Sequence, residues 1–377
     1  MNILKKNLYI NGQITSLAYR IKETIGYGKV DSMGVTIKDV AKRAGVATST
    51  VSRTIKDNPN ISQATKDKVR KAMQELGYVP NVAAQNLANR WTKNIGLILP
   101  PASSEDQKEH SETERIKNPF FMDIITQISQ YLNEEQYTAT IAAEDTMKKL
   151  LKVVQIMHQQ KRVDGFILLY SAENDKITRY LLENQIPFVM LGMPTQYENE
   201  IRYVDNDNIS VGRTATQYLI EKGHEKVGFV GFRNHEPVHL ERFEGYFLEM
   251  KRQKLQPMEG FDVRDPKQVQ EFVSALQDGK FTAIVVSDDI LAVKLIPLLA
   301  TYGYKVGENF SCISINNSIF STLYHPYLTT VDIHVQELAK QSAKLIIDVL
   351  KNPELSLTKY IIPHHIVVRE TVIPNKK

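Results

Sequence analysis

The sequence predicts an α/β protein in which a small three-helix head precedes two similar, doubly wound subdomains. Three observations predict this class. Apolar residues recur at helical spacing in three short segments that follow residue 34. Beyond residue 94, continuous apolar runs alternate with helix-period stretches, as in βαβ units. Residues 94–377 follow this pattern, which is long for one doubly wound domain and favours two subdomains.

The first segment, residues 1–33, begins with Lys5 and Lys6, as a secretory signal would. Polar residues then interrupt the apolar stretch that such a signal needs, and no small-residue cleavage site appears. We therefore expect a flexible, disordered extension without function. The alternative is that translation starts at Met33, because the first helical module begins directly after it.

Residues 34–80 are predicted to form a helix-turn-helix. Thr36 is placed to cap a first helix that Gly45 ends, and a second helix is expected over 49–55. Ser62 caps a third helix, whose end is marked by Gly77. Three short helices with a glycine-containing turn between the first two are typical of this motif. Residues 81–93 contain a short segment rich in Ala and Gln and are expected to link this head to the body.

The body that follows, residues 94–377, contains the strands. Seven apolar runs are predicted to be buried strands of parallel sheets covered by helices on both faces: 95–100, 139–143, 165–170, 187–191, 227–231, 283–287 and 310–315. The segment 103–117 has no apolar periodicity, and we expect it to be a mobile surface loop. Cys312 lies within the last apolar run, so we expect a buried thiol without a redox role.

Charge is distributed unevenly along the chain. The net charge is +4, yet residues 34–93 carry 11 Lys and Arg against 4 Asp and Glu, which is +7. Residues 1–33 carry 5 basic and 2 acidic residues (+3), which leaves 4 − 7 − 3 = −6 for residues 94–377. A basic head on a mildly acidic body indicates a polyanion-binding module joined to another function.

The second predicted helix carries side chains suited to the DNA major groove. Short polar residues at its start can reach base edges, and a longer donor further along can bind guanine. Thr48, Ser49, Thr50, Ser52 and Arg53 supply this set, with Arg53 as the candidate for bidentate hydrogen bonding. The alternative is an ordinary surface helix, since Ser and Thr also serve as caps.

The segment 35–88, VTIKDVAKRAGVATSTVSRTIKDNPNISQATKDKVRKAMQELGYVPNVAAQNLA, resembles the DNA-binding head of the lactose-repressor/galactose-repressor (LacI/GalR) family. The resemblance implies base contacts by the second helix and phosphate contacts by Ser62, Thr65 and Asn81. It also implies that residues 81–93 form a hinge helix and linker, and that the hinge helix enters the minor groove. Leu87 then takes the place of a leucine wedge that parts a base step. The candidate DNA-contacting residues are Thr36, Thr48, Ser49, Thr50, Ser52, Arg53, Ser62, Thr65, Asn81 and Leu87.

The body resembles the same family through NPFF (118–121), VDNDN (204–208), ERFEGY (241–246) and SDDILAVKL (287–295). This implies two Rossmann-like subdomains of the periplasmic-binding-protein type that close on a small ligand. By resemblance, the candidate effector-binding residues are Phe120, Phe121, Asp205, Arg242 and Asp289. An Arg and an Asp suit the vicinal hydroxyls of a sugar. The alternatives are a surface ion pair for Arg242, a helix cap at Asp288 or Asp289, and core packing for the phenylalanines.

One stretch departs from the family. Many relatives have an aromatic residue followed by two aspartates after the strand that matches 310–315, whereas this chain has Ile315, Asn316 and Asn317. That strand end borders the effector cleft in relatives, so the departure alters the ligand set expected there. The segment 103–117, close before NPFF, is an insertion that could change the mouth of the cleft.

Enzyme chemistry is not expected. The chain lacks a phosphate-cradling glycine loop, G-x-S-x-G and H-E-x-x-H, and no cofactor is implied. The adjacent Asp288 and Asp289 should point apart, with one of them capping a helix. If His364 and His365 lie on a strand, they alternate sides and should not chelate one metal ion together, and no metal site is predicted.

The sequence thus predicts a cytoplasmic, sequence-specific transcription regulator, expected to be a repressor that binds palindromic operator DNA as a homodimer. Within the family, the head and NPFF look most like maltose-operon repressors, which implies a sugar effector such as maltose or a maltodextrin. One alternative is a global carbon regulator controlled by a phosphorylated carrier protein. Another is a solute-binding transport protein, which the basic head and the missing secretion signal disfavour.

Overall fold

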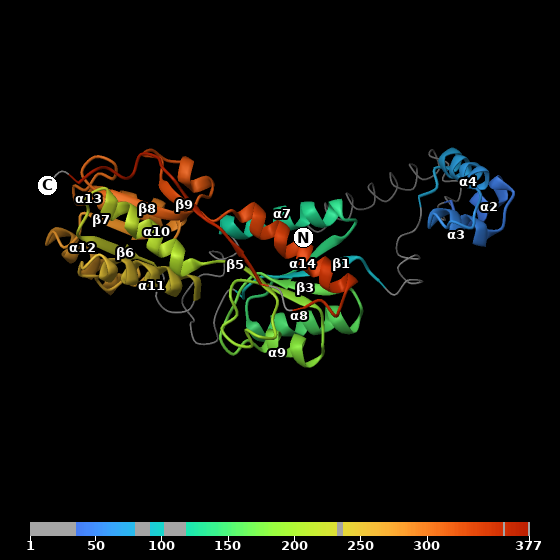
Figure 1. Ribbon diagram of the computed structural model, residues 1–377, viewed down its shortest axis with the longest axis horizontal. Helices are drawn as coiled ribbons and strands as arrows, with labels where there is room; N and C mark the ends of the chain where they lie inside the picture. Colours follow the sequence, from blue (N-terminus) through green and yellow to red (C-terminus); the bar gives the residue numbers. More distant parts are fainter. Residues whose placement is uncertain (1–34, 80–90, 102–117, 232–236, 357–358, 376–377) are drawn as a thin grey trace, which may run out of the picture. The chain divides into compact units, whose positions relative to one another are not determined.

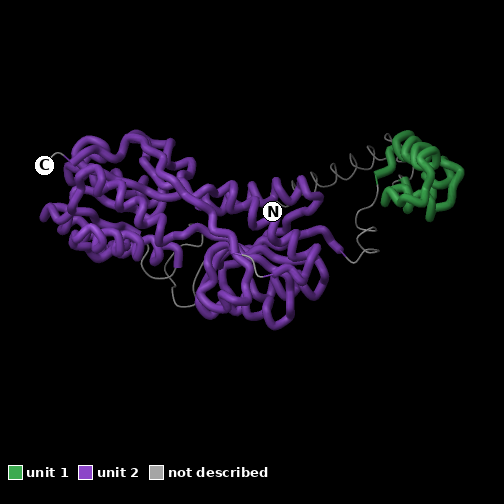
Figure 2. The backbone as a smooth tube through the Cα atoms, viewed as in Figure 1, with its two compact units in different colours: residues 1–90 green, residues 91–377 purple. Residues whose placement is uncertain are grey.

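The structure is a computed structural model that describes residues 35–79, 91–101, 118–231, 237–356 and 359–375. The chain divides into two compact units, which we call unit 1 (Met1–Arg90) and unit 2 (Trp91–Lys377) (Figure 2). Three predicted segments lie outside the described residues: the extension 1–33, most of the predicted hinge (81–90) and the insertion 103–117. The interpretations given for them stay predictions.

The described part of unit 1, residues 35–79, contains three helices around one small core: α2 (Ile37–Ala44), α3 (Thr48–Ile55) and α4 (Gln63–Leu76) (Figure 1). The core forms because apolar residues recur at helical spacing, so that one face of each helix is buried. Its fully buried members are Val40, Ala41, Ala44, Val51, Val69 and Ala72. Thr36 and Ser62 cap α2 and α4, and Gly45 and Gly77 end them in the left-handed conformation, as predicted.

Unit 2 has two sheets, each covered by helices on both faces. The first sheet is parallel and has the order β10-β5-β4-β3-β1-β2. Its strands are β1 (Asn94–Ile98), β2 (Thr138–Ala142), β3 (Gly165–Leu168), β4 (Phe188–Leu191), β5 (Tyr203–Asn206) and β10 (Lys359–Ile362). Helices α7 (Pro119–Glu134) and α14 (Val335–Lys351) pack on one face, and α8 (Met147–Gln159) and α9 (Lys176–Glu183) on the other. We call this assembly the first lobe.

The second lobe is built around the sheet β11-β9-β8-β7-β6, in which only β11 runs antiparallel. Its strands are β6 (Val227–Val230), β7 (Ala283–Val286), β8 (Ser311–Asn316), β9 (Thr329–Asp332) and β11 (His365–Val367). Helices α10 (Asn208–Glu221) and α11 (Pro237–Arg252) cover one face, and α12 (Pro266–Gln277) and α13 (Asp289–Thr301) the other. A 3-10 helix, η1 (Ile319–Thr322), follows β8.

The chain passes between the lobes after β5, after β9 and after β10, and we call residues 206–208, 333–334 and 363–364 the crossover region. Asn206 forms hydrogen bonds to the two other segments that cross between the lobes. Its buried side-chain amide donates to the carbonyl oxygens of Ile333 (3.0 Å) and Ile362 (2.9 Å). One amide therefore bonds to the two other crossings, which fixes where the lobes join.

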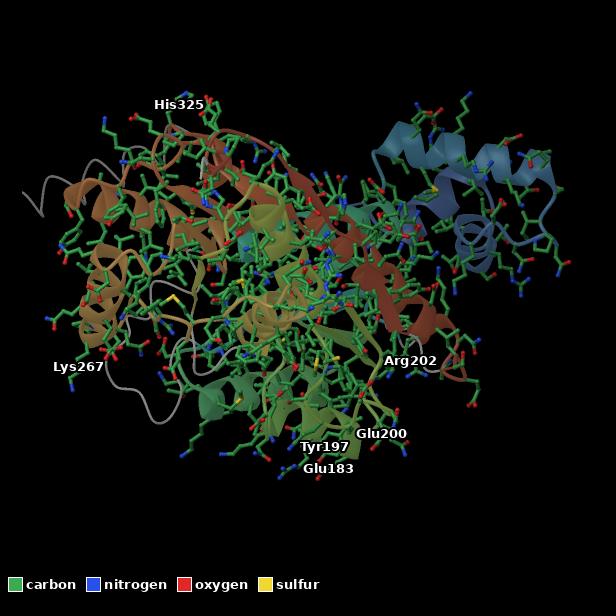
Figure 3. The ribbon with its side chains drawn as sticks, turned by 60° about the vertical axis from the view of Figure 1, so that its left-hand side comes forward. Glu183, Tyr197, Glu200, Arg202, Lys267 and His325 are labelled. Carbon is green, nitrogen blue, oxygen red and sulfur yellow. The ribbon has the colours of Figure 1, made fainter. Side chains whose placement is uncertain are left out.

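All seven predicted strands are present, and the α/β class with a helical head and two doubly wound subdomains is confirmed. Cys312 is fully buried in the core of the second lobe, as expected, and burial raises the pKa of its thiol to about 12. Charged side chains such as Glu183, Glu200 and Lys267 are exposed on the outside of unit 2 (Figure 3). Among the described residues, no helix is both long and apolar enough to cross a membrane.

Candidate functional sites

The first candidate site is the exposed face of α3. Val51 is fully buried and Ile55 packs partly against the core, so the opposite face of the helix points to solvent. Thr48, Ser49 and Arg53 are exposed on it. The other two predicted residues of this helix, Thr50 and Ser52, are half-buried and border the exposed face. The helix has the shape and polar side chains that a major-groove reader needs.

Helix α3 is held in place by its neighbours. Gly45 adopts a φ of 65°, a left-handed conformation that glycine reaches without strain and that lets the chain turn from α2 into α3. Arg43 of α2 pairs with Glu75 of α4 at 2.6 Å. After α3, Asp57 pairs with Lys66 (2.9 Å) on α4. Because α2 and the residues that follow α3 are both anchored to α4, α3 presents its polar face on a fixed frame.

Three other predicted DNA-contacting residues occupy helix starts. Thr36 and Asp39 form a capping box: the Thr36 hydroxyl donates to the Asp39 carboxylate at 2.7 Å and lowers the pKa of that carboxyl. Ser62 caps α4, and its hydroxyl lies 2.9 Å from that of Thr65. A helix N-terminus favours phosphate, so DNA contacts by these hydroxyls stay predictions. Asn81 and Leu87 lie outside the described residues.

The second candidate site is a cavity of about 430 Å³ in unit 2. It is lined from the first lobe by residues at the carboxyl ends of β3, β4 and β5, and from the second lobe by α11 and by residues that follow β7 and end β8. Ligands of parallel α/β sheets bind at this edge of the strands. The volume lies within the range of about 300–1,000 Å³ that is usual for small-molecule sites.

Arg242 lies in the wall of this cavity and is 3% exposed. Its Nε donates to Asn208 Oδ1 (3.0 Å) and its Nη1 to the carbonyl oxygen of Ser287 (2.7 Å). Burial lowers the pKa of the guanidinium to about 10, which the charges of Asp288 and Asp205 counteract. Arg242 is therefore a buried, oriented cation and not the member of a surface ion pair.

Carboxylates surround this arginine. Asp205, at the cavity wall, accepts from the backbone N–H of Met193 at 2.7 Å, and burial raises its pKa to about 6. Glu241, which the sequence did not single out, also lines the cavity. Burial, together with the charge of Asp205, raises the pKa of Glu241 to about 7. The cavity thus concentrates acidic groups around one guanidinium.

The two adjacent aspartates point apart and one of them caps a helix, as predicted. Asp288 caps α13 by accepting from the backbone N–H of Leu291 (2.7 Å), and it lines the cavity. Asp289 is 1% exposed and accepts from the hydroxyls of Ser314 and Thr330, at 2.5 and 2.9 Å. It is not among the residues that line the cavity. Contact between Asp289 and an effector stays a prediction, and Asp288 is better placed for it.

The apolar part of the cavity is aromatic and aliphatic. Phe120 and Phe121, at the start of α7, both line it and meet edge to face, with ring centroids 5.4 Å apart. Tyr170 lines the opposite stretch after β3, and its hydroxyl bonds to the Asp175 carboxylate at 3.3 Å. Ser171 adds a buried hydroxyl that has no hydrogen-bond partner within the described residues. Such a hydroxyl is available to a polar ligand.

The departure from the family pattern after β8 is visible here. Asn316 and Asn317 both adopt positive φ angles, 112° and 53°, a region that asparagine tolerates better than most residues. Asn316 lines the cavity, whereas the Asn317 amide donates to Asp332 at 2.9 Å. The sequence did not predict that Glu241, Asp288 and Asn208 line the cavity. The spacing of residues along the chain does not show which side chains of a helix face a strand that is distant in the sequence.

Comparisons with known proteins identify the family of the chain. Residues 36–81 match the family described as bacterial regulatory proteins, lacI family, and residues 216–372 match a periplasmic binding protein-like domain. The chain is 35% identical over 344 residues to the HTH-type transcriptional regulator MalR of Streptococcus pneumoniae serotype 4, covering 89% of this chain and 99% of the relative.

Two solved structures share the fold. A complex of the transcriptional regulator CelR with cellobiose has a TM-score of 0.64 and 25% identity, covering 89% of this chain and 99% of that one. The lac repressor dimer bound to operator and the anti-inducer ONPF has a TM-score of 0.73 and 22% identity, covering 90% of this chain and 99% of that one.

Proposed function

The chain belongs to the lacI family of bacterial regulatory proteins, and on that premise we propose that it represses a sugar-utilisation operon with maltose or a maltodextrin as effector. Its class is that of DNA-binding transcription regulators, which are not enzymes. We further propose that it acts in the cytoplasm as a homodimer. One head reads a half-site, so a palindromic operator calls for two heads.

The observation that carries the effector proposal is the charge pattern of the cavity. Arg242 is held with Nε and Nη1 committed to the protein, while Asp205, Glu241 and Asp288 surround it. Excess carboxylate disfavours phosphorylated or acidic ligands, because like charges would meet in a partly buried space. Sugar hydroxyls can donate to these carboxylates and accept from a guanidinium, with Phe120 to pack against an apolar ring face.

The DNA proposal assigns base reading to Thr48, Ser49, Thr50, Ser52 and Arg53, and phosphate contacts to Thr36, Ser62 and Thr65. By family resemblance, Asn81 adds a phosphate contact and Leu87 a minor-groove wedge. Effector binding would change how far the two lobes are open or closed, and this change would alter the operator affinity of the paired heads.

The effector proposal is tested by operator binding, followed by fluorescence anisotropy on a palindromic DNA selected by the protein itself. We expect maltose or maltotriose to shift the operator Kd, and maltose 6-phosphate to have no effect. Asp288→Asn is the informative variant because asparagine also caps helices, so α13 should persist. Loss of a hydrogen bond to a charged group should weaken the sugar response about 10- to 100-fold.

Two results would contradict the proposal. No shift with any sugar, or an unchanged response in both Asp288→Asn and Arg242→Ala, would remove the effector assignment. A phosphorylated carrier protein is the alternative partner, and it forms a separate arm of the titration. A response to the carrier alone would favour a global carbon regulator.

A further inference from the structure

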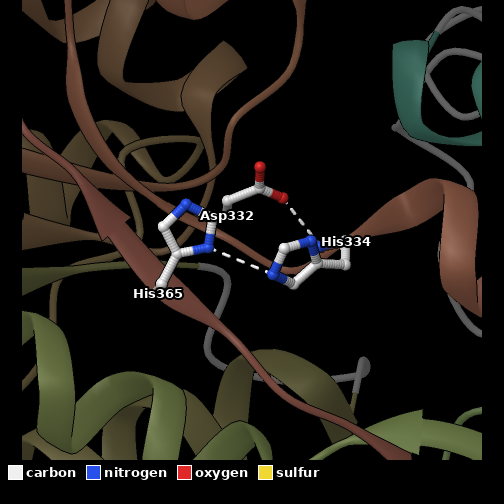
Figure 4. A group of neighbouring side chains, drawn as sticks. All are labelled: Asp332, His334 and His365. Carbon is white, nitrogen blue, oxygen red and sulfur yellow. Dashed lines mark hydrogen bonds between the residues drawn. The ribbon is translucent and has the colours of Figure 1, made fainter.

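Three side chains outside both candidate sites converge beside the crossover region: Asp332 at the end of β9, His334 before α14, and His365 at the start of β11 (Figure 4). His334 Nε2 and His365 Nδ1 lie 3.1 Å apart. One possible ligand atom from each of the three residues lies within 4.8 Å of the others. In a tetrahedral zinc site with bonds of about 2.0–2.2 Å, ligand atoms are about 3.3–3.6 Å apart. Small side-chain rotations would bring the three groups to that spacing.

The backbone holds these side chains together before any ion binds. His365 and Asp332 are direct partners in the antiparallel pairing of β11 with β9, so their side chains leave the same face of the sheet. His334 has a φ of 53°, an unusual conformation for a residue other than glycine. That turn places its ring against the ring of His365, with centroids 4.9 Å apart. Two ligands are thus set by strand register and the third by a left-handed turn.

The carboxylate of Asp332 is also oriented. Its Oδ1 accepts from the backbone N–H of His334 (2.7 Å) and its Oδ2 from the amide of Asn317 (2.9 Å). Asn317 is in turn held by Arg369, whose Nη2 donates to its Oδ1 at 2.7 Å. Each carboxylate oxygen keeps a lone pair for a further partner. Hydrogen bonds that orient ligands in this way are typical of metal sites.

Space for further ligands exists next to the cluster. A cavity of about 210 Å³ is lined by Asp332 and His334, and also by Asp123 of α7. Two imidazoles and a carboxylate leave a fourth position of a zinc ion open, which a water in this cavity would fill. The alternative is that the two rings share only a hydrogen bond, in which one nitrogen carries the proton. The oriented third carboxylate favours a cation over this alternative.

We propose that Asp332, His334 and His365 bind a divalent transition-metal ion of the zinc type. Nitrogen and carboxylate donors of this kind suit Zn²⁺, Co²⁺ and Ni²⁺ and do not suit Ca²⁺ or Mg²⁺. The ligands come from the β9–α14 and β10–β11 crossings, so the ion joins two of the connections between the lobes. None of the three ligands is among the residues that line the large cavity assigned to the effector.

The test uses the untagged full-length chain and Co²⁺ as a spectroscopic probe. We expect one Co²⁺ per chain, with visible absorption bands of a site containing nitrogen ligands, and displacement by Zn²⁺. His365→Ala should weaken Co²⁺ binding at least about 100-fold, because loss of a ligand costs no less than loss of the groups that orient it. Asn317→Ala should weaken it about 10-fold while the absorption bands persist.

His334→Asn is the variant that protects the fold, because asparagine tolerates the left-handed conformation and lacks the imidazole. It should lose Co²⁺ affinity like His365→Ala while its circular dichroism is unchanged. His325→Gln is the matched control: His325 belongs to the second lobe, its side chain is 69% exposed, and it pairs with Glu370 (Figure 3). Its affinity for Co²⁺ should equal that of the unmodified chain. No Co²⁺ binding by the unmodified chain would overturn the proposal, and so would His334→Asn and His365→Ala variants that bind Co²⁺ as tightly as the unmodified chain does.

Discussion

At the scale of single residues, the cavity concentrates carboxyl groups that resist ionisation. Burial and the neighbouring Asp205 charge raise the pKa of Glu241 from 4.5 to about 7. The folded chain therefore holds a proton between pH 4.5 and 7 that the unfolded chain releases. Since the unfolded state binds fewer protons in this window, stability falls as the pH rises through it.

Glu241→Gln removes this titration. We expect the free energy of unfolding of the variant to fall less between pH 5 and pH 8 than that of the unmodified chain, and to exceed it at pH 8. Urea unfolding at both pH values measures the difference. A smaller pH dependence should remain, because burial raises the pKa of Asp205 from 3.8 to about 6. Glu244→Gln, an exposed change on the same helix, is the control. Identical pH profiles for Glu241→Gln and the control would contradict the assignment.

Sequence reasoning identified some of these residues and missed others. Arg242, Asp205, Phe120 and Phe121 were reached through family resemblance, and all four line the cavity. Asp289 was also reached through the resemblance, but Asp288 and not Asp289 is among the residues that line the cavity. The proximity of His334 to His365 was not predicted, because the two histidines lie 31 residues apart in the chain and only the fold brings them together.

At the scale of elements, the contact between α10 and α11 positions Arg242. Two glycines let these helices approach closely. A Cβ added at Gly212 would lie 2.0 Å from the carbonyl oxygen of Arg242, and one at Gly245 would lie 2.0 Å from that of Ile209. Neither backbone atom can move without shifting its helix.

Gly212→Ala should therefore force α11 away from α10. We expect a loss of at least about 1–3 kcal/mol in the free energy of unfolding, which is the usual cost of overpacking. The sugar response should weaken as well, because the backbone of Arg242 is the group displaced. Chemical denaturation and the operator titration measure the two effects. Gln217→Ala, on the exposed side of α10, should change neither. If the Gly212→Ala chain were as stable as this control, the α10–α11 contact would accommodate a methyl group and the prediction would be wrong.

The elements were predicted unevenly. The seven long apolar runs, the three helices of unit 1 and the glycines that end α2 and α4 were predicted close to where they lie. The strands β5, β9, β10 and β11 were not assigned. Their sequences are less apolar than those of the predicted strands, because residues such as Asp205 and Asp332 interrupt them. These strands flank the crossover region, where polar side chains serve the connection between the lobes and hide the pattern of a buried strand.

At the scale of the whole molecule, charge separates the two functions. Residues 34–93 carry +7, whereas residues 94–377 carry −6. Binding to DNA phosphates releases counterions, so affinity should fall steeply as salt increases. The acidic charge of the body adds nothing to that attraction, which must come from unit 1. Non-specific affinity therefore depends on the summed charge of the head, whereas specificity depends on the few side chains of α3 that reach bases.

Arg53→Ala separates these contributions. Loss of a bidentate contact to guanine should cost about 1–3 kcal/mol of operator binding, while affinity for scrambled DNA should change little because the remaining basic residues still neutralise phosphates. Anisotropy titrations on both DNAs over a series of salt concentrations measure the two affinities. Arg179→Ala removes the same charge from an exposed site in unit 2 and should leave both curves unchanged. An equal loss on operator and scrambled DNA would make Arg53 a phosphate contact, and base reading would then belong to the hydroxyls of Thr48 and Ser49.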